Sequence, residues 1–175
     1  MVVVFGSINA DIVATVAVLP REGETRTASG YAVHAGGKGA NQALAARRAG
    51  ARVTLVGAVG RDGFAEIALG TLRDAGVDLS GVAISTRPTG IALIHVDAQG
   101  RNTITVVPGA NADARGAAVA DAALGPATTL LLQLEVPATE VIALAARAHD
   151  RGSRVILNLA PPAPVPDALL DAVDV

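Results

Sequence analysis

Short runs of apolar residues alternate along the chain with longer stretches whose apolar positions recur at helical spacing. The runs predict four buried strands, at Val2–Phe5, Val53–Val59, 128–134 and 154–159. The stretches between and after them predict helices at 39–49, 62–75, 114–123, 138–151 and 166–173, with Asp62 placed to cap the second. Such alternation is typical of an α/β fold in which helices flank a mostly parallel sheet.

Two parts of the chain depart from this alternation. Residues 11–18 and 25–33 are extended, polar-interrupted segments that precede the first helix. Gly90–Val96 and Asn102–Val107 are two more extended runs, joined by a turn-like tetrapeptide at 97–100 that predicts a β-hairpin. We therefore expect one α/β domain over 1–175, with a small β lid built from about 11–35 and 90–108.

Composition narrows the function classes. The chain has 175 residues, 51% of them hydrophobic, only three aromatic residues and a net charge of -2 without basic runs. These values do not favour nucleic acid or an anionic membrane as a partner, and no apolar stretch has the roughly 20 residues of a membrane span. There is no cysteine, and the three histidines lack metal-ligand spacing. The amino terminus does not resemble a signal peptide, so we expect a cytoplasmic protein whose partner is a small molecule.

Three glycines surround a lysine at the start of the first helix, in the order Gly36-Gly37-Lys38-Gly39, and Asn41 follows in the first turn. Glycines let a backbone approach a ligand closely, and a helix start presents free N–H groups beside the mobile lysine cation. Because Gly39 follows Lys38, the segment does not match a nucleotide-binding phosphate loop. It is either a cradle for a polar ligand or a glycine turn between lid and helix.

Asn9 and Asp11 follow directly after the first strand, where an open α/β sheet presents its ligand crevice. If this segment is extended, both side chains lie on one face. A carboxylate can accept bonds from two neighbouring hydroxyls while an amide both donates and accepts, which suits a sugar diol. An Asx-turn that only shapes the loop remains the alternative.

Glu135 ends the Leu-rich run at 130–134 and precedes Pro137, which opens a helix. A charge next to a buried strand is costly unless it is solvated or paired, so Glu135 belongs at the crevice edge. It is either a neighbour of a bound sugar or cation, or a solvated strand terminus.

Four segments in this order resemble the PfkB family of carbohydrate kinases, and within it the ribokinases. They are Gly6-Ser7-Ile8-Asn9-Ala10-Asp11, Gly36-Gly37-Lys38-Gly39-Ala40-Asn41-Gln42-Ala43, Pro108-Gly109-Ala110-Asn111 and Gln133-Leu134-Glu135-Val136-Pro137. The resemblance spans essentially the whole chain. It implies a ribokinase-like α/β fold and ATP-dependent phosphorylation of D-ribose, with Mg²⁺ and a monovalent cation as activators.

Carried over by position, the resemblance assigns the sugar contacts to one set of residues. They are Asn9, Asp11, Gly36, Gly37, Lys38, Asn41 and Glu135. Val106 or Val107 would form an apolar wall against the sugar ring. The β lid would close over the sugar and could pair two subunits in a homodimer.

The resemblance stops short of the reaction centre. The family's Asn-x-x-Glu magnesium segment, its Gly-Ala-Gly-Asp segment with the catalytic aspartate, and its adenine pocket are expected beyond Val175. The C-terminal part of the fold is therefore expected to be missing from this chain, which alone should be inactive and bind neither ATP nor metal. Two alternatives stay open: a non-catalytic sugar-binding or lid-pairing fragment, and a kinase for another sugar or nucleoside.

Overall fold

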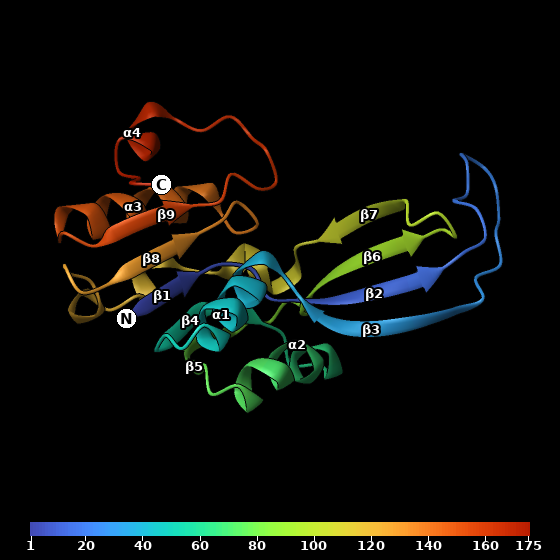
Figure 1. Ribbon diagram of the computed structural model, residues 1–175, viewed down its shortest axis with the longest axis horizontal. Helices are drawn as coiled ribbons and strands as arrows, with labels where there is room; N and C mark the ends of the chain where they lie inside the picture. Colours follow the sequence, from blue (N-terminus) through green and yellow to red (C-terminus); the bar gives the residue numbers. More distant parts are fainter.

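The computed structural model describes residues 1–175 and is built around a parallel sheet of five strands (Figure 1). The strand order is β5-β4-β1-β8-β9, and every neighbouring pair is parallel. The bounds are β1 (Val2–Phe5), β4 (Val53–Val59), β5 (Asp78–Ile84), β8 (Thr129–Leu132) and β9 (Arg154–Leu157). The predicted mostly parallel α/β fold is thus confirmed.

Helices cover both faces of this sheet. On one face α1 (Lys38–Arg48) and α2 (Gly63–Asp74) pack in one apolar cluster with β1 and β4. On the other, α3 (Ala138–Asp150) and the short α4 (Asp167–Leu170) pack with β8 and β9 (Figure 1). The helix surfaces against the sheet are rich in fully buried alanines, which let helix and sheet approach closely in a core with few aromatic side chains.

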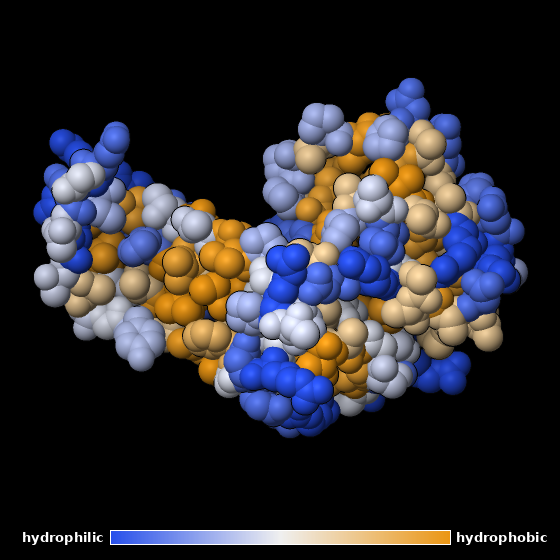
Figure 2. All heavy atoms as spheres, turned by 180° about the vertical axis from the view of Figure 1, so that it is seen from behind, coloured by the Kyte–Doolittle hydropathy of each residue, from blue (hydrophilic) through white to orange (hydrophobic).

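A second sheet of four strands extends from the end of the core (Figure 1). Its order is β3-β2-β6-β7, with β2 (Asn9–Thr15), β3 (Gly30–Gly36), β6 (Gly90–Val96) and β7 (Asn102–Val107). The pair β6 and β7 is the predicted antiparallel hairpin, and β2 pairs with β6 in parallel. Apolar side chains gather on this sheet where it meets the core (Figure 2).

One predicted helix is wrong. Residues 114–123 form two short 3-10 turns, Gly116–Ala118 and Asp121–Ala123, although their alanine content favours an α-helix. The Glu140 carboxylate accepts the N–H of Gly116, and the Arg147 guanidinium donates to carbonyls in the same stretch. The carbonyls of Gly116 and Val119, which an α-helix would have paired internally, are thus bonded to Arg147 instead.

The strand β5 is absent from the sequence-based prediction. It carries Ser80 and Gly81 in its centre, so it has no apolar run. Gly81 is nevertheless required by packing, because a Cβ there would lie 2.7 Å from a methyl group of Val56 in β4. Similarly, β3 begins at Gly30, so the predicted extended segment at 25–33 is displaced toward the helix.

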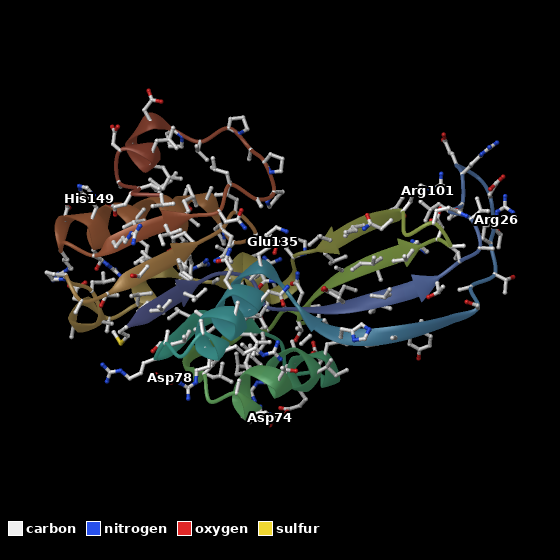
Figure 3. The ribbon with its side chains drawn as sticks, in the orientation of Figure 1. Arg26, Asp74, Asp78, Arg101, Glu135 and His149 are labelled. Carbon is white, nitrogen blue, oxygen red and sulfur yellow. The ribbon has the colours of Figure 1, made fainter.

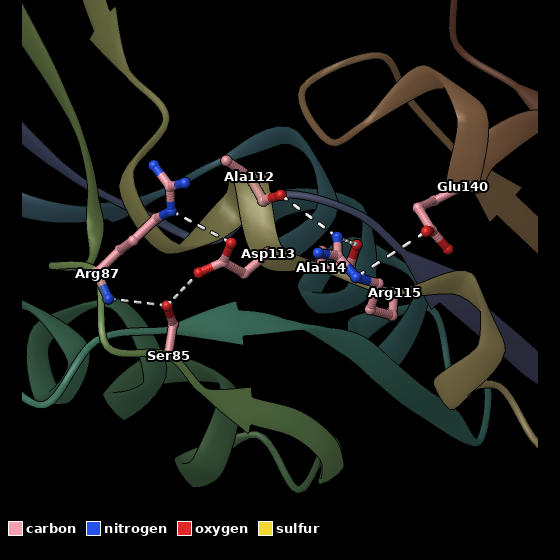
Figure 4. Close-up of polar contacts among 7 residues, drawn as sticks. All are labelled: Ser85, Arg87, Ala112, Asp113, Ala114, Arg115 and Glu140. Atoms are coloured by element: carbon pink, nitrogen blue, oxygen red, sulfur yellow. Dashed lines mark hydrogen bonds and ion pairs between the residues drawn. The ribbon is translucent and has the colours of Figure 1, made fainter.

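Polar contacts anchor the four-stranded sheet to the core (Figure 4). Asp113, in the 3-10 turn Gly109–Asp113 after β7, accepts bonds from the Ser85 hydroxyl at 2.6 Å and the Arg87 guanidinium at 3.2 Å. Ser85 and Arg87 belong to the connection from β5 to β6. Both ends of the hairpin are therefore fastened at one point of the core.

The helices of this fold are too short or too polar to span a bilayer.

Candidate functional site

A cavity of about 140 Å³ lies where the two sheets meet, beside the start of α1. It is lined by Asn9, Asp11, Gly37, Lys38, Asn41, Ala92, Ile94, Ile104, Val106 and Glu135. Six of the seven residues singled out in the sequence thus surround one space, although they come from three separate parts of the chain. Glu135 is labelled at this junction in Figure 3.

The seventh residue, Gly36, lies behind this lining and makes room for Asp11. The two residues are on neighbouring strands, and a Cβ at position 36 would lie 2.2 Å from the Asp11 carboxyl group. Any side chain there would displace the carboxylate. Asn9 and Asp11 lie in strand β2 rather than in a turn, so their side chains reach the cavity from one face of the strand.

The first backbone N–H groups of α1 are hydrogen-bonded to side chains of the same chain. Gly37 precedes the helix with a φ of 90°, a conformation that favours glycine. The Lys38 N–H donates to Glu135 Oε2 at 3.1 Å, and the Gly39 N–H donates to the Ser7 hydroxyl at 3.4 Å. The expectation that this helix start offers free N–H groups to a ligand is therefore wrong, because Glu135 and Ser7 occupy them.

The Glu135 carboxylate makes three polar contacts, one of which is the bond from the Lys38 N–H. Its Oε2 also accepts the Ser7 hydroxyl at 2.6 Å, and its Oε1 lies 3.2 Å from Lys38 Nζ. Only 13% of its side chain is exposed, so it is not a solvated strand terminus. The cavity therefore contains a paired cation and anion whose positions are fixed by β8, α1 and the end of β1.

Asp11 is the acidic group of the cavity without such partners. Partial burial raises the pKa of its carboxyl group above the usual value, and the nearby negative charge of Glu135 raises it further. His34 and Lys38 oppose the shift. Asp11 is thus a carboxylate whose charge is poorly compensated by the protein, which suits an acceptor for ligand hydroxyls.

Several residues in or beside the cavity escaped sequence reasoning. Ser7 and the walls Ala92, Ile94 and Ile104 were not identified, although the alternation in Gly90–Val96 would place Ala92 and Ile94 on one face. Of the two candidate wall residues, Val106 lines the cavity and Val107 does not. A second link joins the segment after β8 to α1, since the Gln133 side-chain amide donates to the Gln42 side-chain carbonyl at 2.5 Å.

A wider apolar groove of about 560 Å³ adjoins the cavity and shares Lys38, Glu135, Ile104 and Val106 with it. Its other walls are Pro108, Ala112, Leu134, Val136, Pro137 and Pro161. The ion pair of Lys38 and Glu135 thus stands between a small polar cavity and a larger apolar space. No group of three or more His, Asp or Glu side chains is placed to hold a metal ion.

Comparison with known proteins agrees with this geometry. The model of the pfkB family carbohydrate kinases matches residues 1–175. The chain belongs to the pfkB family of carbohydrate kinases. It is 37% identical to the ribokinase of Haemophilus influenzae over 175 residues, which is 98% of this chain and 57% of that protein. The chain thus spans little more than half the length of this curated pfkB relative.

Solved structures of pfkB proteins share the fold. The Thermotoga maritima ribokinase superposes with a TM-score of 0.89 at 32% identity, covering 99% of this chain and 57% of that one. The Arabidopsis thaliana ribokinase, solved with ribose and ATP, superposes with a TM-score of 0.81 at 33% identity and covers 99% and 58%. The expected ribokinase-like architecture is therefore confirmed for the part of the pfkB fold that this chain contains.

Proposed function

We propose that this chain is the sugar-binding part of a ribokinase, which phosphorylates D-ribose with ATP. The single observation that carries the proposal is the convergence of Asn9, Asp11, Lys38, Asn41 and Glu135 on one small cavity with an apolar wall. The ribose-bound Arabidopsis relative supports ribose as the guest, since the two chains share fold and 33% identity.

The proposed contacts follow from the chemistry of these groups. Asp11 accepts hydrogen bonds from the sugar hydroxyls, while the amides of Asn9 and Asn41 can both donate to and accept from them. Lys38 donates from its ammonium group, which Glu135 keeps in place. Gly36 and Gly37 contribute space and backbone shape rather than side-chain bonds. Ile94, Ile104 and Val106 pack on the less polar parts of the ring.

In this proposal the four-stranded sheet is the lid over the sugar. Its strands β2, β6 and β7 supply one wall of the cavity, while α1 and the segment after β8 supply the other. A guest between them would exclude water from the hydroxyl contacts and strengthen each one.

The phosphoryl donor and its metal are assigned to no residue of this chain. The pfkB family implies ATP, Mg²⁺ and a monovalent cation, but the acidic side chains present do not form a metal-holding cluster. What residues 1–175 supply is the binding and orientation of the acceptor sugar. Positioning of this kind is a large part of catalysis in phosphoryl transfer.

Two measurements on the purified protein at its full coding length test the proposal. Titration calorimetry should give saturable heat with D-ribose, and a coupled assay should show ADP formation that depends on ribose. A folded protein that gives no heat at millimolar ribose would contradict the sugar assignment. Faster turnover of fructose or a nucleoside than of ribose would assign the site to another substrate of the family.

A second candidate is sugar binding without catalysis, which needs only the polar lining of the cavity and no phosphoryl donor. Saturable ribose heat without any ribose-dependent ADP formation would select this alternative.

We also propose that the four-stranded sheet pairs two copies of the chain. Leu93 and Val107 are large apolar residues that remain exposed, and their strand register places them on the face of this sheet opposite to the cavity. Analytical ultracentrifugation should detect a dimer that Leu93→Asp weakens. An entirely monomeric protein over a concentration range of about 100-fold would contradict pairing.

A further inference from the structure

Asn111 lies outside the cavity lining and is almost completely buried, with 1% of its surface exposed. It sits in the 3-10 turn Gly109–Asp113, which follows β7, and its side chain reaches the connection between β1 and β2. There it makes three hydrogen bonds, to Ile8 and to Asn9. Asn9 is itself a residue of the cavity and is 3% exposed.

The bonds to Ile8 fix the orientation of the Asn111 amide. A backbone N–H can only donate and a backbone carbonyl can only accept. The Ile8 N–H donates to Asn111 Oδ1 at 2.9 Å, and the Ile8 carbonyl accepts from Asn111 Nδ2 at 3.2 Å. An inverted amide would place donor against donor and acceptor against acceptor, so the Ile8 backbone determines which end of Asn111 carries the NH₂ group.

The same constraint passes on to Asn9. The second N–H of Asn111 Nδ2 donates to Asn9 Oδ1 at 2.7 Å. Because Nδ2 is a donor, the atom of Asn9 that faces it must be the oxygen. The NH₂ group of Asn9 is then directed away from Asn111. Asn9 therefore offers the cavity a donor beside the acceptor Asp11.

The side-chain amides of Asn9 and Asn111 are closely packed against Gly90. Gly90 lies opposite Asn9 on β6, and a Cβ at Gly90 would lie 2.3 Å from Asn111 Nδ2 and 2.4 Å from Asn9 Oδ1. The paired amides thus fill the space that the glycine leaves open. The bond between them is buried, where a mismatched or unpaired polar group is costly.

We propose that Asn111 is a positioning residue that sets the hydrogen-bonding polarity of Asn9, so that the site recognises a ligand oxygen able to accept from Asn9. This inference rests on the proposed function, since the ligand oxygen is taken to be a ribose hydroxyl. One hydroxyl can accept from Asn9 and donate to Asp11 simultaneously. The pair would therefore select hydroxyl over a group that only accepts or only donates.

The test uses Asn111→Asp, which keeps an acceptor for the Ile8 N–H but has no donor for Asn9. The Asn9 amide should then turn its NH₂ group toward the new carboxyl group and present oxygen to the cavity beside Asp11. We expect ribose affinity by calorimetry to fall about 10- to 100-fold, the range for a mismatched buried hydrogen bond. Asn102→Asp, an exposed position at the start of β7, is the control for the added charge and should bind ribose as the wild type does.

A double variant separates positioning from general damage. If Asn111 acts through Asn9, Asn111→Asp should cause no further loss of affinity in an Asn9→Ala background. A further loss as large as in the wild-type background would overturn the proposal. Wild-type protein without ribose heat would refute the proposed function, whereas wild-type heat that Asn111→Asp leaves unchanged would refute only the role of Asn111.

A measurement on the unmodified protein covers the case in which the variant does not fold. In ¹⁵N-resolved NMR spectra, the side-chain NH₂ signals of Asn9 should shift on addition of ribose, because they face the ligand. The NH₂ signals of Asn111 should stay and exchange slowly with solvent. Rapid exchange at Asn111, or an Asn9 signal unaffected by saturating ribose, would contradict the assigned polarity.

Discussion

Glu135 contacts Lys38 at both its backbone and its side chain: one carboxylate oxygen accepts the Lys38 N–H at 3.1 Å, and the other lies 3.2 Å from Nζ. A single residue after β8 thereby closes the start of α1 and holds the cation of the cavity. The stability of the helix start and the geometry of the site thus depend on the same carboxylate. Substitutions here should affect both properties together.

Glu135→Gln tests this double role. The neutral amide keeps one acceptor but loses the charge that attracts the helix start and Lys38, and it leaves the buried Ser7 hydroxyl with a weaker acceptor. We expect the free energy of unfolding to fall by about 1–3 kcal/mol and ribose affinity to fall as well. Urea unfolding and calorimetry measure the two effects.

The matched control is Glu66→Gln, which removes the exposed ion pair of Glu66 with Arg73 on α2. Such pairs contribute about 0–1 kcal/mol, so stability should change little and ribose binding not at all. Equal losses of stability in the two variants would show that Glu135 acts only as an ordinary surface charge.

Gly36→Ala should weaken ribose binding without preventing folding. The added Cβ would lie 2.2 Å from the Asp11 carboxyl group, which must move, and the Asp11 side chain can do so by rotating within the cavity. We expect a loss of affinity of about tenfold, equivalent to one displaced hydrogen bond. Calorimetry measures the affinity and circular dichroism checks the fold.

The control for this prediction lies at the other end of the same strand. A Cβ added at Gly30 would meet no atom within 4 Å, so Gly30→Ala should leave ribose affinity unchanged. If both variants bind ribose like the wild type, the space beside Asp11 does not matter for the ligand.

Asp11→Asn should make the protein more stable at neutral pH while weakening sugar binding. The pKa of Asp11 is raised in the folded state by burial and by Glu135, so the folded protein binds a proton at this site more readily than the unfolded chain. Stability at this site is therefore lost as pH rises through the folded-state pKa, and the neutral amide avoids that loss. The stability gain of the variant should shrink as pH falls below the pKa of an ordinary aspartate. Thermal unfolding across the range from acid to neutral pH measures this, and a variant less stable than the wild type at neutral pH would contradict it.

The sequence predicted the frame of the fold well because strands buried on both faces read as continuous apolar runs. The strand Val53–Val59 and the cap at Asp62 were both correct. The edge strand β5, with Ser80 and Gly81, was missed since pairing with β4 rather than hydrophobicity defines it. The false helix at 114–123 arose because alanine propensity cannot anticipate that Arg147 binds the carbonyls of Gly116 and Val119.

At the site, too, features with a local sequence pattern could be predicted, whereas features that depend on long-range contacts could not. The sequence could single out Asn9, Asp11 and Lys38, which line the cavity, because polar residues at strand ends and glycines at a helix start have a local pattern. Ser7 and Asn111 act on other side chains through contacts across 128 and 102 positions of sequence, and nothing local marks them for that role. The closure of α1 by Glu135 was missed for the same reason, since it joins residues 97 positions apart.

As the pH is lowered, the affinity for ribose should begin to decrease at a higher pH than it would if Asp11 had the pKa of an ordinary aspartate. Binding uses ionised Asp11, and its raised pKa means that the free protein must release a proton at a pH where an exposed aspartate is already ionised. Burial and the charge of Glu135 raise this pKa, while His34 and Lys38 lower it. Calorimetry of ribose binding over a pH series from acid to neutral, in two buffers of different ionisation enthalpy, should therefore reveal proton release. The release should be absent in Asp11→Asn, while equal release in the variant would assign it to a neighbouring group instead.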